Sequence, residues 1–363
     1  MLLISISIVV GVLYLFLILA FVIGWNQNYT FEPKGNESVT TKVSVIIACK
    51  NEQENIQHLI SYIAQQSYQN FELIIVNDHS TDATKFLIKQ AIPSFPKIKL
   101  LDAVGFGKKN AIKEGILHST TDFIVTIDAD CFPTFHWLES IVCFQKKLPS
   151  DLLICPVKIS ERENFFQRIQ ALEFVSLVAS GAGAAGIGTP ILCNGANLAF
   201  TKQAWLNCQA ELHKEELSGD DIFLLQSIKK RGGVIRFVKS ESALINTKPV
   251  TNFTDFIKQR RRWTSKSPAY TDWHIIMVAV LVLSTAVVEL TLMYHAISNQ
   301  RFLIVFGVFF LFKYLLDFKF LSIVQDFFHL KKVGIESLFL SIIYPFYIVF
   351  VAFSTFIFKP KTW

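Results

Sequence analysis

The first residues of the chain contain the feature that most limits its fold. Leu2 to Gly24 is a run of 23 residues without a charged side chain, and about 20 apolar residues suffice for a helix to cross a bilayer. The run has no basic start and no small-residue cleavage pattern at its end, so an anchor is favoured over a cleaved signal peptide. We therefore expect residues 1–25 to form an N-terminal transmembrane anchor.

Three more apolar stretches occupy the C-terminal part of the chain. They run over about residues 274–297, 302–324 and 335–358, and the middle one is interrupted by Lys313, Asp317 and Lys319. We expect residues 273–358 to form a membrane region with about three hydrophobic segments. A location of one of the last segments in the membrane interface, without crossing, stays open as an alternative.

Basic residues predict the orientation of these segments. Arg260, Arg261 and Arg262 precede the second apolar stretch, and Lys34 and Lys42 follow the first. Positive side chains prefer the cytoplasmic side of a membrane. The pattern predicts an integral protein of the inner or plasma membrane, in contact with membrane lipids and with its central domain in the cytoplasm.

The central part of the chain has the composition of a cytosolic globular domain. All six cysteines lie in it, without a Cys-x-x-Cys pair, which favours reduced, buried thiols over disulfides or a zinc site. The net charge of +6 is modest. Because no stripe of basic and aromatic residues is present, we expect no nucleic-acid partner.

Residues 42–265 contain β-rich and helical patterns in alternation. Each short apolar run is followed by a segment whose apolar residues have helical spacing. The four pairs are KVSVIIACKNE with ENIQHLISYIAQQ, FELIIVND with STDATKFLIKQAI, KIKLLDA with GKKNAIKEGILHS, and DFIVTIDAD with FPTFHWLESIVCFQKKL. This order predicts an α/β domain with a mostly parallel sheet covered on both faces. Ser80 and Asp82 are expected to cap the second helix.

Polar side chains follow three of the expected strands. Ligands of such sheets bind at the carboxyl ends of the strands. Any one of these residues is explained better by turn or capping chemistry, but together they predict a ligand site. They are Lys50, Asn51 and Glu52 after the first strand, Asn77 and Asp78 after the second, and Asp128 and Asp130 after the fourth.

The pair Asp128 and Asp130 suggests what that site binds. In an extended strand, residues i and i+2 point to the same side, so both carboxylates are expected to face one spot. Such a pair suits a hard divalent cation, which takes oxygen ligands and keeps phosphate oxygens in its other positions.

Seven segments, taken in order, resemble a known motif series. They are VSVIIACKNE, VNDHSTDAT, GKKNAIKEG, TIDADC, NGANLAF, SGDDIFLL and QRRRW. The series is similar to that of membrane-bound family 2 glycosyltransferases, the group that includes cellulose, chitin and hyaluronan synthases, over about residues 42–263. The resemblance implies a GT-A fold, a nucleotide-diphosphate sugar donor, a Mg2+ or Mn2+ ion and an inverting transfer.

The resemblance also implies roles in donor binding. By motif, Ala48 and Glu52 line the nucleotide pocket, Asp78 hydrogen-bonds to the base, expected to be uracil, and Lys108 reaches the diphosphate. Asp128 lies near the ribose and the metal, while Asp130 is the firmer metal ligand.

Catalytic roles follow from the last two motifs. In SGDD, Asp221 corresponds to the general base of the family, and Asp220 replaces the more usual Glu, which blurs the division of roles between the two acids. In QRRRW, Gln259, Arg262 and Trp263 match the segment that closes over donor and acceptor. For Arg260 and Arg261, contact with lipid headgroups is an equal alternative to a role in the site. For Trp263, the alternative is that it anchors the chain at the membrane interface.

The segment from Asn164 to Gly186 remains outside these motifs. Its apolar residues and small-residue tail predict an amphipathic helix that packs on the sheet or lies at the membrane interface.

The sequence thus predicts an inverting, metal-dependent hexosyl- or N-acetylhexosaminyltransferase. It would use a UDP-sugar and a lipid-linked or growing glycan acceptor at the cytoplasmic membrane face. Two alternatives stay open: a processive polysaccharide synthase, which the Gln-x-x-Arg-Trp pattern favours, and a non-catalytic relative that binds nucleotide sugar. A transporter is disfavoured, because the apolar segments carry few polar residues.

Overall fold

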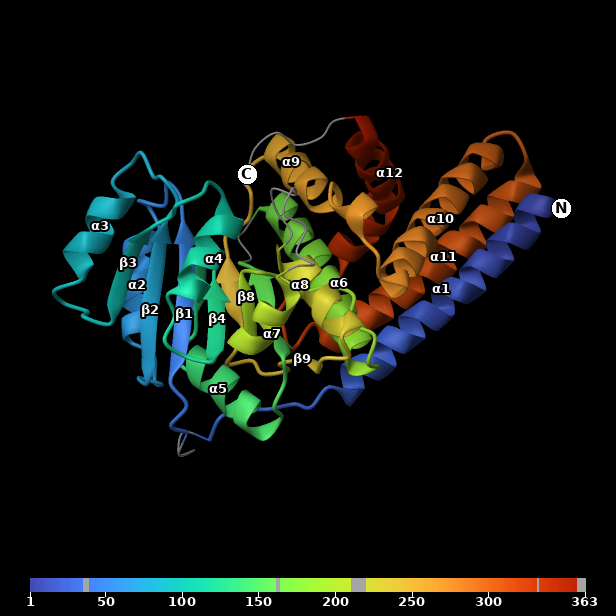
Figure 1. Ribbon diagram of the computed structural model, residues 1–363. Helices are drawn as coiled ribbons and strands as arrows, with labels where there is room; N and C mark the ends of the chain where they lie inside the picture. The colour runs from blue at the N-terminus through green and yellow to red at the C-terminus, as the bar shows by residue number, and fades with distance from the viewer. Residues whose placement is uncertain (35–38, 161–163, 210–219, 332, 358–363) are drawn as a thin grey trace. The chain divides into compact units, whose positions relative to one another are not determined.

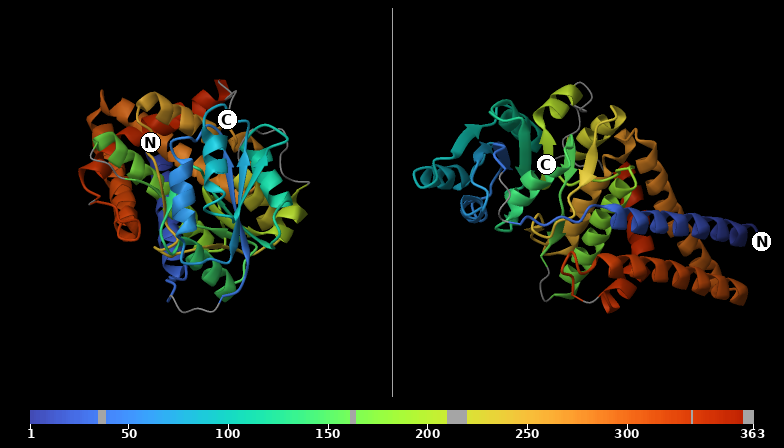
Figure 2. Two further views of the ribbon diagram at one scale, coloured as in Figure 1. Left: turned by 90° about the vertical axis from the view of Figure 1, so that its left-hand side faces the viewer. Right: turned by 90° about the horizontal axis from the view of Figure 1, so that it is seen from below.

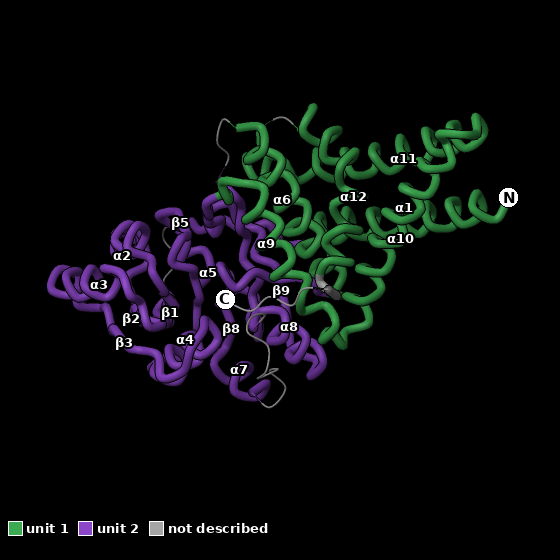
Figure 3. Tube along the Cα trace, turned by 90° about the horizontal axis from the view of Figure 1, so that it is seen from above, with its two compact units in different colours: residues 1–27, 161–189, 249–361 green, residues 28–160, 190–248, 362–363 purple. Residues whose placement is uncertain are grey.

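The computed structural model describes residues 1–34, 39–160, 164–209, 220–331 and 333–357. These residues form two compact units, shown in different colours in Figure 3. Unit 1 comprises the described parts of residues 1–27, 161–189 and 249–361, and unit 2 comprises those of residues 28–160 and 190–248. Residues 164–189 and 249–265, which were expected to lie in the 42–265 domain, group here with the N- and C-terminal helices.

Unit 2 is built on a seven-stranded sheet with the order β3-β2-β1-β4-β8-β6-β9 (Figure 1). Neighbours among the first four of these are parallel, as are β6 and β9, whereas β8 is antiparallel to β4 and β6. The mostly parallel α/β sheet expected from the sequence is confirmed. The strands are β1 (Val43–Cys49), β2 (Phe71–Asn77), β3 (Ile98–Asp102), β4 (Phe123–Ile127), β6 (Leu152–Ile154), β8 (Asn197–Thr201) and β9 (Ile235–Phe237).

Helices follow the first four strands in the predicted alternation. Of these, α4 packs on β1 and β2 at Gly115, where an added Cβ would lie 2.5 Å from Ile46 Cγ2. The helices of unit 2 are α2 (Ile56–Ala64), α3 (Thr84–Ala91), α4 (Lys108–Leu117), α5 (Trp137–Lys147), α7 (Lys202–Cys208) and α8 (Asp220–Lys230).

The central strands are buried along their whole length. All seven residues of β1 and all five of β4 are buried, which explains why these strands are apolar almost throughout rather than alternating. The six cysteines are free and buried, as predicted.

A small second sheet lies beside the end of β4. It has the order β5-β10-β7, formed by β5 (Cys131–Pro133), β10 (Ile245–Thr247) and β7 (Val157–Ile159). Because β5 begins directly after Asp130, this sheet fixes the chain on the far side of the Asp128–Asp130 segment.

The expected cap of α3 is correct for one residue and wrong for the other. Asp82 Oδ1 accepts the backbone N–H of Thr84 at 2.9 Å. Ser80 does not cap the helix, because α3 begins only at Thr84. Its hydroxyl instead accepts the backbone N–H of Asn51 at 3.1 Å and joins the ends of β1 and β2.

Unit 1 consists of helices, and α1 packs along α6, α10 and α11. Figure 2 shows the long helices of this unit side by side. They are α1 (Leu2–Gln27), α6 (Phe165–Gly186), α9 (Phe253–Thr264), α10 (Trp273–Ala296), α11 (Gln300–Val324) and α12 (Ile335–Ile357), with a short 3-10 turn at Ser267–Ala269.

Among the described residues, four helices are long and apolar enough to cross a membrane: α1, α6, α10 and α12. The helix expected over 302–324 is present as α11 but is not one of the four, since Lys313, Asp317 and Lys319 interrupt its apolar sequence. In its place the set includes α6, which the sequence analysis did not propose as a span.

The charges of α11 have partners within unit 1. Lys313 Nζ lies 3.0 Å from Asp317 Oδ2 and 4.0 Å from Glu289 Oε2 of α10. Tyr14 of α1 donates its hydroxyl hydrogen to Asp317 Oδ1 at 2.6 Å. These contacts pair the buried ionic groups inside the helix bundle, which reduces the cost of burying them.

Helix α6 is confirmed, and it packs on the helices α1 and α12 of unit 1; its expected location at the membrane interface stays a prediction. Its small-residue tail lies against α1, where an added Cβ at Gly186 would lie 1.9 Å from Gly24 O and one at Gly24 would lie 1.8 Å from Gly183 O. The small residues allow the two backbones to touch, as small residues do at membrane helix interfaces.

Candidate active site

The carboxyl ends of β1, β2 and β4 bring the first group of expected site residues to one edge of the sheet. Ala48, near the end of β1, pairs in register with Val76 of β2 and is buried. Glu52 follows β1 and Asp78 follows β2. The edge therefore combines the residues that the motif series assigns to the nucleotide.

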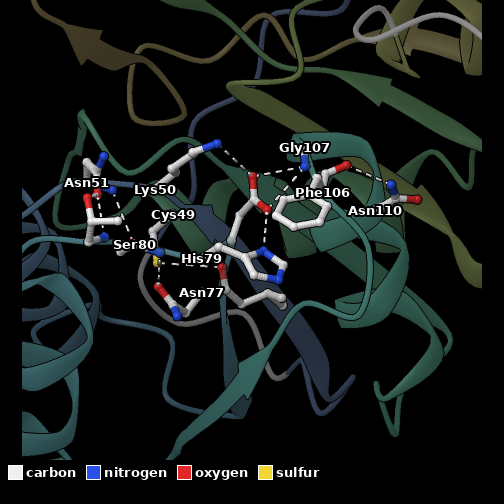
Figure 4. A network of polar contacts seen from close by, with 12 residues as sticks. Cys49, Lys50, Asn51, Asn77, His79, Ser80, Phe106, Gly107 and Asn110 are labelled. Atoms are coloured by element: carbon white, nitrogen blue, oxygen red, sulfur yellow. Dashed lines mark hydrogen bonds and ion pairs between the residues drawn. The ribbon is translucent and has the colours of Figure 1, made fainter. Parts of the chain in front are cut away.

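Asp78 is completely buried. It holds the loop before α4 and contacts Lys50, His79 and Gly107, which are labelled in Figure 4. Its two carboxylate oxygens accept the backbone N–H of Gly107 at 3.0 and 3.1 Å, and Lys50 Nζ lies 4.0 Å away. The ring of His79, which contacts Asp78 Oδ1 at 3.1 Å, stacks on Phe106 with centroids 4.2 Å apart. Asp78 thus fixes the residue directly before Lys108.

Lys108, the first residue of α4, forms an ion pair with Asp128. Burial alone would lower the pKa of Lys108, but the charge and hydrogen bond of Asp128 together with the charges of Asp221 and Asp130 outweigh burial, and the pKa is raised. The Lys108 side chain, which is expected to reach a diphosphate, therefore keeps its positive charge beside Asp128 and Asp130.

Asp128 and Asp130 lie in a turn, not on an extended strand. Strand β4 ends at Ile127, and the backbone N–H of Cys131 donates to Asp128 O at 3.1 Å. The premise that strand alternation points both carboxylates to one side is therefore wrong. Thr247 of β10 donates its hydroxyl hydrogen to Asp130 Oδ2 at 3.3 Å and helps to orient that carboxylate.

The two acids nevertheless interact electrostatically. Burial and the negative charge of Asp128 raise the pKa of Asp130. Burial also raises the pKa of Glu52, with Asp130 and Asp128 adding to the rise. Negative charge at this edge is therefore only partly compensated by the protein.

Two further acids lie at the N-terminal end of α8. Asp221 Oδ2 accepts the backbone N–H of Gly195 at 2.9 Å, which connects the SGDD and NGANLAF segments. Asp220 Oδ1 lies 3.4 Å from Lys109 Nζ. The serine and glycine of SGDD lie outside the described residues.

Burial raises the pKa of Asp220 to about 6, although the nearby Lys109 works in the opposite direction. The charges of Asp221 and Asp130 add to the rise in the pKa of Lys108. The acids of α8 and those of the β4–β5 turn thus act on the same lysine.

Lys109 is a site residue that the sequence analysis missed. The two adjacent lysines of GKKNA could have indicated this residue, but the motif resemblance assigned a role only to Lys108. At the start of a helix, consecutive side chains point about 100° apart, and here each lysine meets a different acid.

The acidic edge offers two carboxylates to a divalent cation. Among the described residues, no group of three or more His, Cys, Asp and Glu side chains is close enough to hold a metal ion. Asp128 and Asp130 supply two carboxylates on one turn, and Mg2+ is commonly held by one or two carboxylates together with substrate phosphates. The residues fit a cation shared with a bound diphosphate.

Gln259, Arg262 and Trp263 lie on α9, which belongs to unit 1. All three are partly buried. Their neighbour Arg260 is 2% exposed and pairs with Glu173 of α6, so the suggestion that its side chain reaches lipid headgroups is wrong.

Known proteins resemble this chain in both sequence and fold. Residues 44–207 match the model of glycosyl transferase family 2. A poly-β-1,6-N-acetyl-D-glucosamine synthase of Staphylococcus epidermidis is 28% identical over 159 residues, which are 42% of this chain and 37% of that protein. The corresponding synthase of Staphylococcus aureus strain COL is 26% identical over 151 residues, 40% of this chain and 36% of that protein. The match thus spans little more than a third of these relatives.

A solved structure with a similar fold is that of the mannosyltransferase PcManGT from Pyrobaculum calidifontis, in complex with GDP-Man and Mn2+. It superimposes with a TM-score of 0.58 at 15% identity, covering 99% of this chain and 100% of that one. This likeness supports the GT-A fold. By sequence, residues 44–207 are similar to glycosyl transferase family 2, a match that covers less than half of the chain.

Proposed function

We propose that the chain is an inverting glycosyltransferase that moves a hexosyl or N-acetylhexosaminyl group from a nucleotide-diphosphate donor, a UDP-sugar, to a lipid-linked or growing glycan. The observation that carries the proposal is the meeting of four acids and two lysines at the carboxyl edge of the sheet. They are Asp128, Asp130, Asp220, Asp221, Lys108 and Lys109.

The donor would lie along this edge with its nucleotide over the ends of β1 and β2. Ala48 and Glu52 would line the nucleotide pocket. Asp78 was expected to hydrogen-bond to the base, yet both of its oxygens already accept the N–H of Gly107. Because Oδ1 also contacts His79, the second lone pair of Oδ2 is the one that would accept from the base while Asp78 holds the loop.

The diphosphate would meet the positive charge at the start of α4. Lys108 exchanges part of its contact with Asp128 for phosphate oxygens and stabilises the charge that develops as the diphosphate departs. Arg262 of the Gln-x-x-Arg-Trp segment is assigned the same role, with Gln259 and Trp263 enclosing donor and acceptor.

Asp128 and Asp130 would hold the divalent cation, Mg2+ or Mn2+, with Asp130 as the firmer ligand and Asp128 nearer the ribose. When bound, such an ion neutralises developing charge on the leaving diphosphate. The raised pKa of Asp130 supports this assignment, because uncompensated negative charge at this turn favours a cation.

Asp221 would accept the proton of the attacking acceptor hydroxyl. Its carboxylate is fixed by the N–H groups of Gly195 and Ile222, at 2.9 and 2.8 Å, and each oxygen keeps a free lone pair. General base catalysis of this kind contributes about 10²- to 10⁴-fold. Asp220, whose carboxyl is paired with Lys109, would orient the start of α8.

The membrane placement forms part of the proposal. The four apolar helices are long enough to cross a bilayer, and the basic residues of α9 and the linker after α1 support a cytoplasmic position for unit 2. Residues 42–265 would form the transferase, preceded by an anchor and followed by a membrane region.

A processive polysaccharide synthase is the second candidate. It is favoured by the Gln-x-x-Arg-Trp segment and by the named activity of the staphylococcal relatives. The two candidates differ in product length, which a gel or mass spectrum of the product resolves.

The test uses the full chain in detergent or nanodiscs with UDP-glucose, UDP-N-acetylglucosamine, UDP-galactose or GDP-mannose. We expect one of these donors to release its nucleotide when Mn2+ or Mg2+ is present, and we expect EDTA to abolish this release. Binding of a nucleotide sugar without release or transfer would instead identify a non-catalytic relative.

A further inference from the structure

The buried face of α9 is built around a charged side chain. Phe256 and Arg260, one helical turn apart, are 7% and 2% exposed. Arg260 forms a bidentate pair with Glu173 of α6: Nε donates to Glu173 Oε1 at 3.1 Å, and a second guanidinium nitrogen donates to Oε2. A pair in this geometry is among the stronger hydrogen-bonded contacts that proteins make.

Glu173 connects this pair to a third helix. The hydroxyl of Tyr347 on α12 donates to Glu173 Oε1 at 3.3 Å, and the Tyr347 ring lies 5.6 Å from that of Phe256. All of these residues belong to unit 1. The pair therefore ties α9 to both α6 and α12.

Arg260 also contacts the ring of Phe256 and two of the motif residues. One guanidinium nitrogen donates to the side-chain oxygen of Gln259, and the guanidinium lies 4.2 Å from the ring centroid of Trp263. The Trp263 ring also packs against that of Phe174 of α6, with centroids 5.9 Å apart. Arg260 thus touches two of the three residues assigned to donor and acceptor.

We propose that the Arg260–Glu173 pair is a positioning device that fixes the side chains of Gln259 and Trp263 for transfer. Arg260 is then a positioning residue, which acts through its two neighbours and does not itself contact lipid or substrate. The planar guanidinium is needed, because it meets a carboxylate, an amide oxygen and an indole face at once. The inference rests on the proposed function, since it assigns the motif a part in transfer.

A double variant distinguishes a pair that only stabilises the fold from a pair that also positions the motif residues, because the two roles predict a different kcat once stability is restored. Arg260→Met alone leaves a buried carboxylate without its cation, and Glu173→Gln alone leaves a buried cation, so both should unfold at lower temperature. The double variant R260M/E173Q contains neither charge and keeps an acceptor for Tyr347. We expect its thermal midpoint to return toward that of the unaltered protein.

Activity should not return with stability. In R260M/E173Q, Gln259 has lost its donor and Trp263 its cation, so we expect kcat to stay roughly 10- to 100-fold low, with the KM for the donor changed less than about twofold. Lys258→Met, which removes an exposed cation from the same helix, is the matched control and should leave kcat unchanged. A stable double variant with full kcat would overturn the proposal.

A second readout does not depend on activity. The emission of Trp263, obtained by subtracting the spectrum of the corresponding Trp263→Phe protein, should shift to the red and be quenched more readily by acrylamide in the double variant. Unchanged Trp263 emission would also overturn the proposal. If the unaltered protein transfers no sugar, the proposed function fails, and this emission still decides the inference.

If the double variant does not fold, Arg260→Lys provides the test. The ammonium keeps the charge opposite Glu173 but lacks the planar fork, so we expect a near-normal thermal midpoint with a lowered kcat. Full kcat in R260K would show that charge alone suffices and would contradict the positioning role.

Discussion

Asp78 accepts the backbone N–H of Gly107 with both carboxylate oxygens, at 3.0 and 3.1 Å, and thereby fixes the residue next to Lys108. The contact connects the end of β2 with the start of α4. Lys108 in turn pairs with Asp128. The buried carboxylate of Asp78, which follows β2, therefore helps to set the geometry of the acidic turn that follows β4.

Asp78→Asn should loosen this connection. The amide loses the charge and one of the two acceptor oxygens, so we expect the free energy of unfolding to fall by about 1–3 kcal/mol and the KM for the donor to rise. Chemical unfolding and donor kinetics measure the two effects. Asp122→Asn, an exposed substitution just before β4, is the control, and an equal effect there would contradict the role of Asp78.

Asp221→Asn should preserve the fold and donor binding while it removes turnover. The amide oxygen still accepts the N–H of Gly195, but the side chain no longer takes a proton from the acceptor. We expect kcat to fall about 10²- to 10⁴-fold, with donor affinity by calorimetry unchanged. Undiminished turnover in this variant would refute Asp221 as the base.

Asp220 makes stability depend on pH in the mildly acidic range. Its pKa in the folded protein is about 6, against about 3.9 for an unfolded aspartate. The folded protein holds this proton more tightly, so the contribution is fully present below about pH 4 and is lost as pH rises through about 6. Its size is at most about 3 kcal/mol.

Thermal midpoints between pH 4 and 7 measure this effect. Asp220→Asn removes the titrating group, so the fall in stability across that range should become shallower. Asp255→Asn, at an exposed position on α9, should keep the original slope. The assignment is contradicted if the slope is the same in Asp220→Asn.

The crossing of α1 and α6 should not tolerate a methyl group. Gly24→Ala and Gly186→Ala each place a Cβ within 1.9 Å of a backbone oxygen of the facing helix, so the backbones must separate. We expect a loss of about 1–3 kcal/mol, seen as a lower thermal midpoint in detergent. Gly307→Ala, with no neighbour within 4 Å on α11, should be neutral or slightly stabilising.

Lys313→Met should destabilise the helix bundle of unit 1. It removes the cation beside Asp317 and Glu289, and breaking a buried pair by removing one partner costs about 3–5 kcal/mol. Lys319→Met, at an exposed position on the same helix, should cost little. Similar midpoints for the two variants would show that the buried lysine contributes no more than the exposed one.

Much of unit 2 was predictable from local sequence. Strands such as β1 and β2 are short apolar runs, and the helices that follow them repeat apolar residues at helical spacing, so pattern and packing agree. The polar residues after those strands were found because parallel strands present their carboxyl ends at one edge. The wrong expectation of a cap at Ser80 has a physical reason, since the start of α3 at Thr84 depends on contacts between two loops.

The sequence by itself determined the α/β order, the apolar helices and the identity of the acids at the sheet edge, because these follow from periodicity and residue chemistry along the chain. Only the tertiary structure decided that Asp128 and Asp130 lie in a turn, that Lys109 meets Asp220, and that Arg260 is buried against Glu173. Each of these depends on groups distant in sequence, such as Glu173 and Arg260, which are 87 positions apart, and a local sequence pattern does not contain information on contacts over such separations.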